Sequence, residues 1–418
     1  MQADFLIEDA DLVATCAGPG PRRGAAQREI GAMPRATIAA HDGLIVFVGP
    51  SAEARRIVTP TRDAVVIEAR GRTVVPGFVD PHTHLVYAGD RRQELQQRLA
   101  GATYAEIAAA GGGIVKTVEA TRAASEEALV EAALPRLRAM LATGTTTCEV
   151  KSGYGLSTAS EVTMLRAARA VATRQPIEIV TTFMGAHEIP PDYRGRRDAY
   201  VRLVIDEMLP AVAREGLAEW CDVFCEQGVF TPEESRAILE AGRRHGLKPR
   251  IHADELALSG GSRVAVEVGA RSADHLIFVD PPSARAMAEA GVVASLLPSA
   301  AFYLKLGRFA PARMLIEEGV AVALATDINP GGGFATSMPF VMALACFGMG
   351  MTLEEALIGA TLNAAASLDR ADRVGSLEVG KQMDAVIVDG MLSDLIRVGP
   401  PVVGQVVKRG RVVWPTIA

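Results

Sequence analysis

Between Pro76 and Leu368 the sequence alternates between short apolar runs and amphipathic helical patterns. Eight apolar runs resemble buried strands, and helical patterns separate most of them. The runs end at Pro81–His84, Glu149–Tyr154, Phe183–His187, Phe224–Gln227, Ile251–Glu255, Asp274–Phe278, Leu296–Ser299 and Ala325–Asn329. Eight strand–helix units over roughly 290 residues predict a (β/α)₈ TIM-like barrel, in which the C-terminal strand ends share one face.

Helix boundaries within this region carry their own signals. Ser125 precedes a helical run that stops at Gly144, and Thr352 with Glu355 predicts a capping box for a last helix reaching Leu368. The alternative fold is a doubly wound sheet. The sequence has neither a Gly-x-Gly-x-x-Gly motif after an early strand nor a phosphate-binding Gly-x-x-x-x-Gly-Lys-Ser/Thr motif, so the barrel is favoured.

Both ends of the chain differ from this centre, because they consist of short strands separated by turns. The strand runs are Phe5–Val13, Ala36–Ala40, Leu44–Val48, Ala64–Glu68, Ala385–Val388, Val402–Val407 and Val412–Trp414. Isolated short strands need partners, so we predict one small β-sandwich domain from residues 1–75 and 373–418, beside a barrel of residues 76–372. The segment 17–33 is rich in Gly, Pro and Arg, which predicts a mobile loop.

Composition narrows the classes of function. The 418 residues include 43 Lys and Arg against 49 Asp and Glu, and basic residues do not cluster with aromatic ones, so we expect no nucleic-acid partner. The longest apolar stretch falls short of the ~20 residues of a membrane span. Five cysteines without a Cys-x-x-Cys pair, and no signal-peptide pattern, predict a cytoplasmic protein. A homodimer is expected on base rates.

Five of the seven histidines lie at or near predicted strand ends. His82 and His84 are two residues apart on one strand, so both imidazoles project from the same face and can bind one ion. His252 ends another strand. Asp327 follows an apolar run, where an ionised carboxylate is costly unless it is paired or metal-bound. A lone histidine of this kind is more often structural, but three histidines and Asp327 on one face predict a mononuclear zinc or iron site.

Longer motifs surround these residues. They are Val74–His84, Gly89–Arg91, Gly101–Val115, Glu149–Gly155, Gly185–His187, His252–Glu255, Ser272–His275, Asp327–Gly331 and Gly375–Ala385. On these motifs the sequence resembles the amidohydrolase superfamily of metal-dependent hydrolases and, within it, the imidazolonepropionase family. The resemblance covers nearly the whole chain.

The resemblance implies one Zn²⁺ or Fe³⁺ per subunit and a role for each matching residue. The implied metal ligands are His82, His84, His252 and Asp327, and the implied substrate-binding residues are Arg91, Tyr154, His187, Glu255, Asn329, Gly331 and Gly332. Two positions depart from the family pattern. Asp90 replaces a common Asn and could reorient Arg91, while Gly332 and Gly333 replace residues that commonly bear hydroxyl groups.

The implied reaction is hydrolysis of the ring amide of the small molecule 4-imidazolone-5-propanoate to N-formimidoyl-L-glutamate, in histidine degradation. We expect Asp327 to take a proton from water and deliver it to the leaving nitrogen. His275 would polarise the carbonyl oxygen, and Glu255 would orient the ring or share the proton transfer. The sequence leaves open which of these three is the general base.

Other interpretations remain at this stage. A nucleobase deaminase, an atrazine-type chlorohydrolase or another cyclic amidase of the superfamily would share the same ligands. Arg91 offers a fork that suits a propanoate carboxylate, although it could pair with Asp90 or Glu94 instead. A non-catalytic barrel scaffold is disfavoured because the ligand set is complete. The segment 221–227 lacks the lysine that bridges two ions in binuclear relatives, so one metal is expected.

Overall fold

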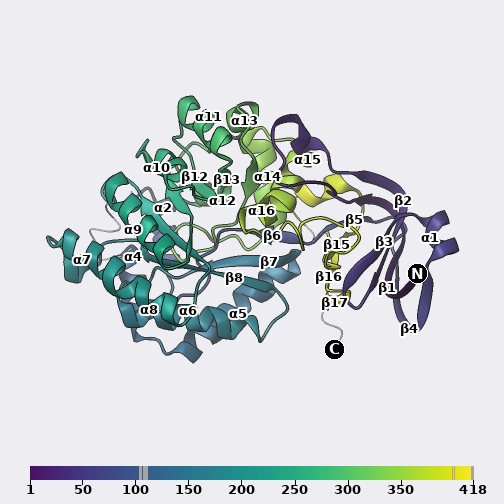
Figure 1. The fold of residues 1–418 in the computed structure, drawn as a ribbon, viewed down its shortest axis with the longest axis horizontal. Helices are drawn as coiled ribbons and strands as arrows, with labels where there is room; N and C mark the ends of the chain where they lie inside the picture. The colour runs from purple at the N-terminus through teal and green to yellow at the C-terminus, as the bar shows by residue number, and fades with distance from the viewer. Residues whose placement is uncertain (103–105, 107–111, 398, 400, 416–418) are drawn as a thin grey trace.

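The computed structural model describes residues 1–102, 106, 112–397, 399 and 401–415. Figure 1 shows a strand-and-helix barrel on the left and a separate sheet on the right, where strands of both chain ends lie side by side. The predicted fold class, a (β/α)₈ barrel with a small β-unit built from both termini, is confirmed. Most of the predicted Gly101–Val115 motif lies outside the described residues.

Eight parallel strands line the barrel. In sequence they are β6 (Phe78–Asp80), β7 (Thr145–Lys151), β8 (Glu178–Ala186), β9 (Trp220–Cys225), β11 (Ile251–Ala253), β12 (Ser272–His275), β13 (Val293–Leu296) and β14 (Val322–Leu324). The short β10 (Lys248–Pro249) also pairs with β9. Beyond β6 and β14, the His84 N–H donates to Ile328 O at 2.9 Å and the Asp327 N–H donates to His82 O at 3.1 Å. These bonds join the first and last strand ends, so the C-terminal ends of all eight strands lie around one opening.

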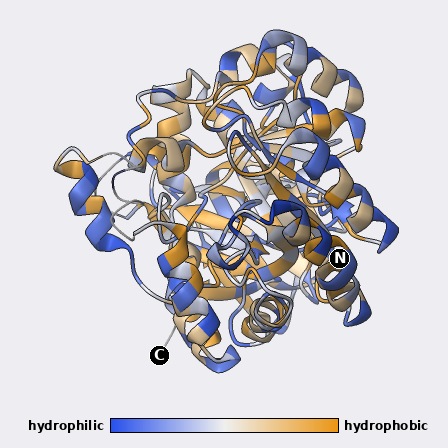
Figure 2. Ribbon diagram, turned by 90° about the vertical axis from the view of Figure 1, so that its left-hand side faces the viewer, coloured by the Kyte–Doolittle hydropathy of each residue, from blue (hydrophilic) through white to orange (hydrophobic). Residues whose placement is uncertain are grey.

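Helices surround the strands. They are α2 (Arg92–Leu99), α4 (Ile114–Ala123), α5 (Glu126–Ala142), α6 (Thr158–Ala172), α7 (Arg197–Leu203), α8 (Leu209–Arg214), α9 (Pro232–Arg244), α10 (Gly261–Glu267), α11 (Pro281–Ala290), α12 (Pro298–Tyr303), α13 (Ala312–Glu317), α14 (Met338–Met349), α15 (Leu353–Ala360) and α16 (Leu362–Ser367). In Figure 2 the central strands are largely hydrophobic and the outer turns of the helices carry hydrophilic residues. No helix of the described ranges is both long and apolar enough to cross a bilayer.

The predicted helix caps are present, but one predicted helix is interrupted. Ser125 accepts a hydrogen bond from the Ala128 N–H, and Thr352 forms the expected capping box with Glu355. The prediction of one helix from residue 352 to Leu368 is wrong, because Thr361 (φ −130°, ψ −93°) separates α15 from α16. The Thr361 hydroxyl donates to the carbonyl of the preceding turn, an alternative to helix continuation that threonine readily adopts.

The terminal sheet has the order β17-β16-β15-β5-β1-β2-β3, with β4 paired to β1. Its strands are β1 (Gln2–Ala14), β2 (Ala32–His41), β3 (Leu44–Pro50), β4 (Thr59–Glu68), β5 (Thr73–Pro76), β15 (Ala385–Val388), β16 (Val403–Lys408) and β17 (Arg411–Trp414). The helix α1 (Ser51–Ile57) follows β3. Antiparallel pairing of β15 with β5 joins the two chain ends, from Ala385 opposite Pro76 to Val388 opposite Thr73.

The segment 17–33, predicted to be a mobile loop, packs against the barrel. Gln27 is fully buried, and its side-chain amide bonds both the N–H and the C=O of Val322 in β14, at 3.2 and 3.0 Å. Asn363 in α16 accepts from the Arg22 N–H at 2.7 Å. These bonds satisfy buried backbone groups, so the segment is anchored despite its loop-like composition.

Candidate metal centre and active site

The candidate ligands come from three strand ends on one face of the barrel. His82 and His84 follow β6, His252 lies in β11, and Asp327 follows β14. Asp327 has a positive φ of 50°, and nearby His275, at the end of β12, has a φ of 76°. Non-glycine residues rarely adopt this region, and backbone strain of this kind is concentrated at functional sites.

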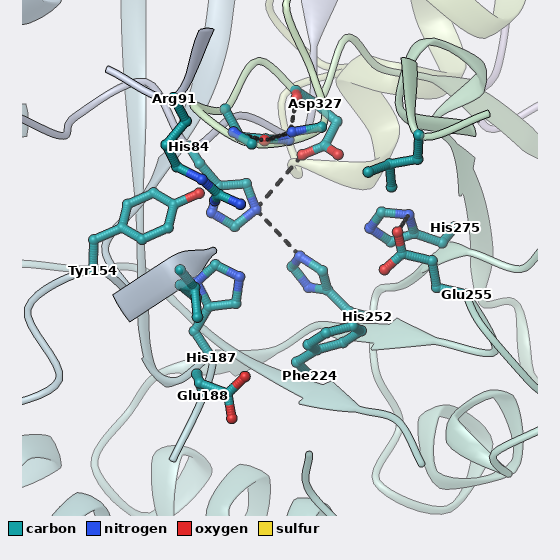
Figure 3. Close-up of a pocket in the computed structure, with 15 residues that line it drawn as sticks. His84, Arg91, Tyr154, His187, Glu188, Phe224, His252, Glu255, His275 and Asp327 are labelled. Carbon is teal, nitrogen blue, oxygen red and sulfur yellow. Dashed lines mark hydrogen bonds and ion pairs between the residues drawn. The ribbon is translucent and has the colours of Figure 1, made fainter. Parts of the chain in front are cut away.

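The ligand atoms meet at one point. The ring nitrogens of His82, His84 and His252 lie within 4.8 Å of one another, and the Nε2 atoms of His84 and His252 are 3.3 Å apart. Oδ1 of Asp327 lies 3.6 Å from Nε2 of both His82 and His84. Figure 3 shows His84 between Asp327 and His252. Nitrogens bound tetrahedrally to one zinc ion at about 2.0–2.1 Å lie roughly 3.3–3.4 Å apart, so the spacing fits a cation.

Unpaired polar atoms support the same conclusion. Nε2 of His82 and Oδ1 of Asp327 are buried without a hydrogen-bond partner among the described residues. Burial raises the pKa of Asp327 to about 8 and lowers the pKa of His82 and His84 well below the usual range. Three imidazoles and a carboxylate that is costly to ionise alone form the donor set for a divalent metal ion.

Buried carboxylates lie behind two of the histidines. Nδ1 of His82 is 2.6 Å from Oδ2 of Asp274, and Nδ1 of His252 is 3.0 Å from Oδ1 of Asp222. A carboxylate accepts hydrogen bonds, so each Nδ1 carries the proton and each Nε2 presents its lone pair to the metal position. Such pairs orient ligands and raise their basicity.

A cavity opens above the ligand atoms. It is lined by His84, Arg91, Ile114, Tyr154, His187, Glu188, Phe224, His252, Glu255, His275, Leu304, Asp327, Asn329, Gly331 and Gly332. Every predicted site residue therefore lies at this cavity, except His82, whose ring lies 4.4 Å from that of His252 and is fully buried.

Arg91 lies on the cavity wall and is almost fully buried. Its Nε and Nη2 donate to the two carboxylate oxygens of Glu94 at 2.9 and 2.7 Å. Asp90 instead accepts from the Arg92 N–H at 2.6 Å. Aspartate at residue 90, in place of the common Asn, thus leaves Arg91 paired with Glu94. The bidentate contact fixes the plane of the guanidinium.

Tyr154 and His187 are held by a buried loop anchor. Both oxygens of Glu161 accept the Gly153 N–H, and Oε1 also accepts the N–H groups of Gly155 and Leu156. The Gly153 carbonyl is 3.0 Å from Nδ1 of His187, so Nδ1 carries the proton. Burial lowers the pKa of His187 to about 3, which leaves a neutral ring with Nε2 as an acceptor.

The loop after β14 is shaped by Asn329. Its Nδ2 donates to Asp327 O at 2.8 Å, and its Oδ1 accepts the N–H groups of Gly331 and Gly332 at 2.9 and 2.6 Å. A Cβ at residue 333 would overlap the Asp327 carbonyl oxygen and lie 2.7 Å from its carbon. Residue 333 is one of the two glycines that replace common hydroxyl-bearing residues. Glycine there permits a close approach to the Asp327 carbonyl that a residue with a side chain would prevent.

Glu255 and His275 face each other on the remaining wall, as Figure 3 shows. Nδ1 of His275 lies 3.4 Å from Oε1 of Glu255, and neither ring nitrogen of His275 has a hydrogen bond within the described chain. Burial raises the pKa of Glu255 well above the usual range, and Asp327 and Glu226 add to the effect. Glu226 holds the segment through the N–H groups of Glu255 and Leu256, at 3.0 and 2.8 Å.

Comparison with known proteins supplies the family. Residues 73–413 match the family model described as "Amidohydrolase family". The chain belongs to the amidohydrolase family.

Among curated amidohydrolases, the imidazolonepropionase of Symbiobacterium thermophilum is 53% identical over 98% of this chain and 97% of its own length. The imidazolonepropionase of Geobacillus kaustophilus is 51% identical over 92% of this chain and 91% of its own length. The similarity therefore extends through both the barrel and the terminal sheet.

Solved structures share the fold of this amidohydrolase at low identity. A triazine hydrolase variant has a TM-score of 0.75 and 18% identity over 98% of this chain and 94% of that chain. An adenosine deaminase from Xanthomonas campestris with bound zinc has a TM-score of 0.72 and 20% identity over 98% and 93% of the two chains. These likenesses concern the fold.

Sequence reasoning missed several residues that this amidohydrolase site uses. Asp222 and Asp274 behind the histidines, the loop anchor Glu161, and Glu188 and Phe224 on the cavity wall were not predicted. Asp222 carried a usable signal, because an acidic residue inside the apolar strand Trp220–Cys225 requires a buried partner. The roles of the others depend on contacts between distant segments.

Proposed function

We propose that this chain has imidazolonepropionase activity and hydrolyses the ring C–N amide bond of 4-imidazolone-5-propanoate to N-formimidoyl-L-glutamate. The observation that carries the proposal is one cavity in which a metal-ligand cluster faces Arg91, Tyr154 and His187. Relatives of that name at 53% and 51% identity support the same reaction. The site would hold one Zn²⁺ or iron ion, bound by His82, His84, His252 and Asp327.

In this proposal Arg91 and Tyr154 bind the propanoate carboxylate. Glu94 holds Nε and Nη2 of Arg91, which orients the guanidinium before substrate arrives. Preorganisation of this kind lowers the entropic cost of binding. Nε2 of His187 accepts a hydrogen bond from a ring N–H of the substrate, because its Nδ1 already donates to Gly153 O.

The reaction adds water across the amide bond. A bound divalent cation supplies Lewis-acid chemistry, polarising the carbonyl and making water acidic near neutral pH. Asp327 takes one proton from the attacking water and delivers it to the ring nitrogen as the C–N bond breaks. The carbonyl carbon becomes a carboxyl group, which releases the second water proton to solvent as it ionises to the carboxylate. His275 donates to the carbonyl oxygen, where negative charge develops, and Glu255 orients the imidazolone ring.

The test is turnover of freshly prepared 4-imidazolone-5-propanoate, followed by loss of its ultraviolet absorbance, with metal analysis of the same sample. We expect turnover that a chelator abolishes and that added metal restores. Arg91→Ala should raise KM sharply, whereas the control Arg92→Ala, whose side chain is 84% exposed, should not. A metal-loaded protein that leaves the imidazolone intact would refute the substrate and direct the search to other cyclic amides and to deaminase substrates.

A further inference from the structure

A buried ammonium group lies directly behind the candidate metal centre. Lys151 ends β7, and its side chain is fully buried. Its Nζ is 2.8 Å from Oε1 of Glu149, 2.7 Å from Oδ2 of Asp222 and 4.0 Å from Oδ2 of Asp274. A buried amine is costly unless its charge is compensated, and here three buried carboxylates surround it. Burial opposes its charge, but Asp222 and Glu149 outweigh burial and raise the lysine pKa.

Two of these carboxylates orient metal-ligand histidines. Asp222 uses Oδ2 for Lys151 and Oδ1 for His252, where it accepts from both Nδ1 (3.0 Å) and the backbone N–H (3.2 Å). Asp274 lies against Nδ1 of His82 at 2.6 Å. Asp222 therefore links the ammonium group to one ligand through its two oxygens.

The third carboxylate holds the backbone between the paired histidines. Glu149 uses Oε1 for Lys151 and Oε2 for the Thr83 N–H, at 3.1 Å. The Lys151 N–H donates to Thr83 O at 3.0 Å, and the Thr83 hydroxyl donates to Glu149 O at 2.6 Å. The end of β7 thus holds Thr83, the residue between His82 and His84, in place.

We propose that Lys151 is a positioning residue for the metal centre, acting on the histidine ligands through Asp222 and Glu149. The inference rests on the metal site of the proposed function and is independent of its substrate. The other buried cation at this level, Arg250, differs in kind. Its Nη2 is 3.3 Å from Asp274, but its remaining bonds go to the backbone carbonyls of Pro81 and Ser367. Arg250 therefore shares Asp274 and otherwise ties backbone segments together, whereas Lys151 bonds only side-chain carboxylates through its Nζ, Asp222 at 2.7 Å and Glu149 at 2.8 Å.

The first experiment measures metal binding in the full-length Lys151→Met variant, which removes the charge at similar volume. The readouts are the zinc dissociation constant by chelator competition and the visible spectrum of the cobalt-substituted protein, which reports ligand geometry. We expect zinc binding about 10- to 100-fold weaker than wild type and an altered cobalt spectrum. The control is Lys248→Met, whose half-exposed ammonium pairs with Asp369 at 2.6 Å and should leave both readouts at wild-type values.

A double-mutant cycle tests the route of the effect. If Lys151 acts through Asp222, the combined loss in Lys151→Met/Asp222→Asn is smaller than the product of the two single losses. Wild-type zinc affinity and cobalt spectrum in Lys151→Met, or single losses that multiply fully, would overturn the proposal.

The outcomes also distinguish a variant that fails to fold, and a wrong proposed function, from a wrong role for Lys151. If Lys151→Met does not fold, the double variant, which has no unpaired charge at residue 222, should still bind zinc at least tenfold more weakly than wild type. Wild-type affinity in that double variant would overturn the proposal. A wild-type protein that binds zinc but does not hydrolyse the imidazolone would refute only the proposed substrate. A wild-type protein that binds no metal would overturn both proposals.

Discussion

Gly331 tests whether the precise position of Arg91 matters, without removing the arginine. A Cβ at residue 331 would overlap Nη1 of Arg91 and lie 2.6 Å from its Cζ. Ordinary van der Waals contact begins at 3.4 Å, so Gly331→Ala must displace the guanidinium by about 1 Å. That shift breaks the bidentate contact with Glu94 and moves the group that we assign to the substrate carboxylate.

The expected cost is one charge-assisted interaction, about 1.5–3 kcal/mol. At about 1.4 kcal/mol per factor of ten, KM should rise roughly 10- to 100-fold. The contact lies away from the scissile amide and is made equally in the ground and transition states, so kcat should change much less. The assay is the steady-state loss of imidazolone absorbance in Gly331→Ala against wild type.

Gly49→Ala, in β3 of the terminal sheet, is the matched control for this prediction. Its added Cβ would lie 2.8 Å from Cζ of Phe47, the far end of a side chain, and neither residue lines the cavity. We expect KM within about twofold of wild type. A Gly331→Ala enzyme with unchanged KM, or equal losses in both variants, would refute the assignment of Arg91 to the carboxylate.

Three further predictions concern stability. Glu161→Ala leaves three backbone N–H groups of the 153–156 loop unpaired, so urea unfolding should show a loss of about 3 kcal/mol or more, and an unchanged midpoint would contradict the anchor role. Burial opposes the charge of Glu355, but Arg313 and Arg28 help hold its pKa below the usual 4.5. Because the folded pKa is the lower one, wild type should exceed Glu355→Gln in Tm at pH 7, and the difference should vanish as pH falls through that pKa; a pH-independent difference would disprove the linkage. Chelation should lower Tm, with recovery on adding zinc, since a ligand that binds only the folded state stabilises it; equal Tm values with and without metal would count against the site.

Local pattern predicted most of the elements and the set of candidate metal ligands. The strands at both ends appear where alternation placed them, and Ala385–Val388 matches its prediction residue for residue. Helix caps depend on residues within one turn, so Ser125 and Thr352 were identifiable. The candidate ligands could be expected to meet because parallel strands in a barrel end on a single face, which brings His82, His252 and Asp327 together whatever the details of packing.

Tertiary structure decided which partner each polar group takes. Asp90 and Glu94 were both candidate partners for Arg91, and only the packed loop selects Glu94. Gln27 is buried against β14 because its side-chain amide bonds the N–H and C=O of Val322 in that strand. The composition of the loop does not show that these backbone groups need a partner. Lys151 likewise gains its role from carboxylates on other strands, one of them 71 residues away. The hydrophobic period of a sequence determines which side of a helix or strand a residue occupies. The hydrogen-bond partners of a polar group depend on ångström-scale distances between segments. Those distances are set only after the chain has packed.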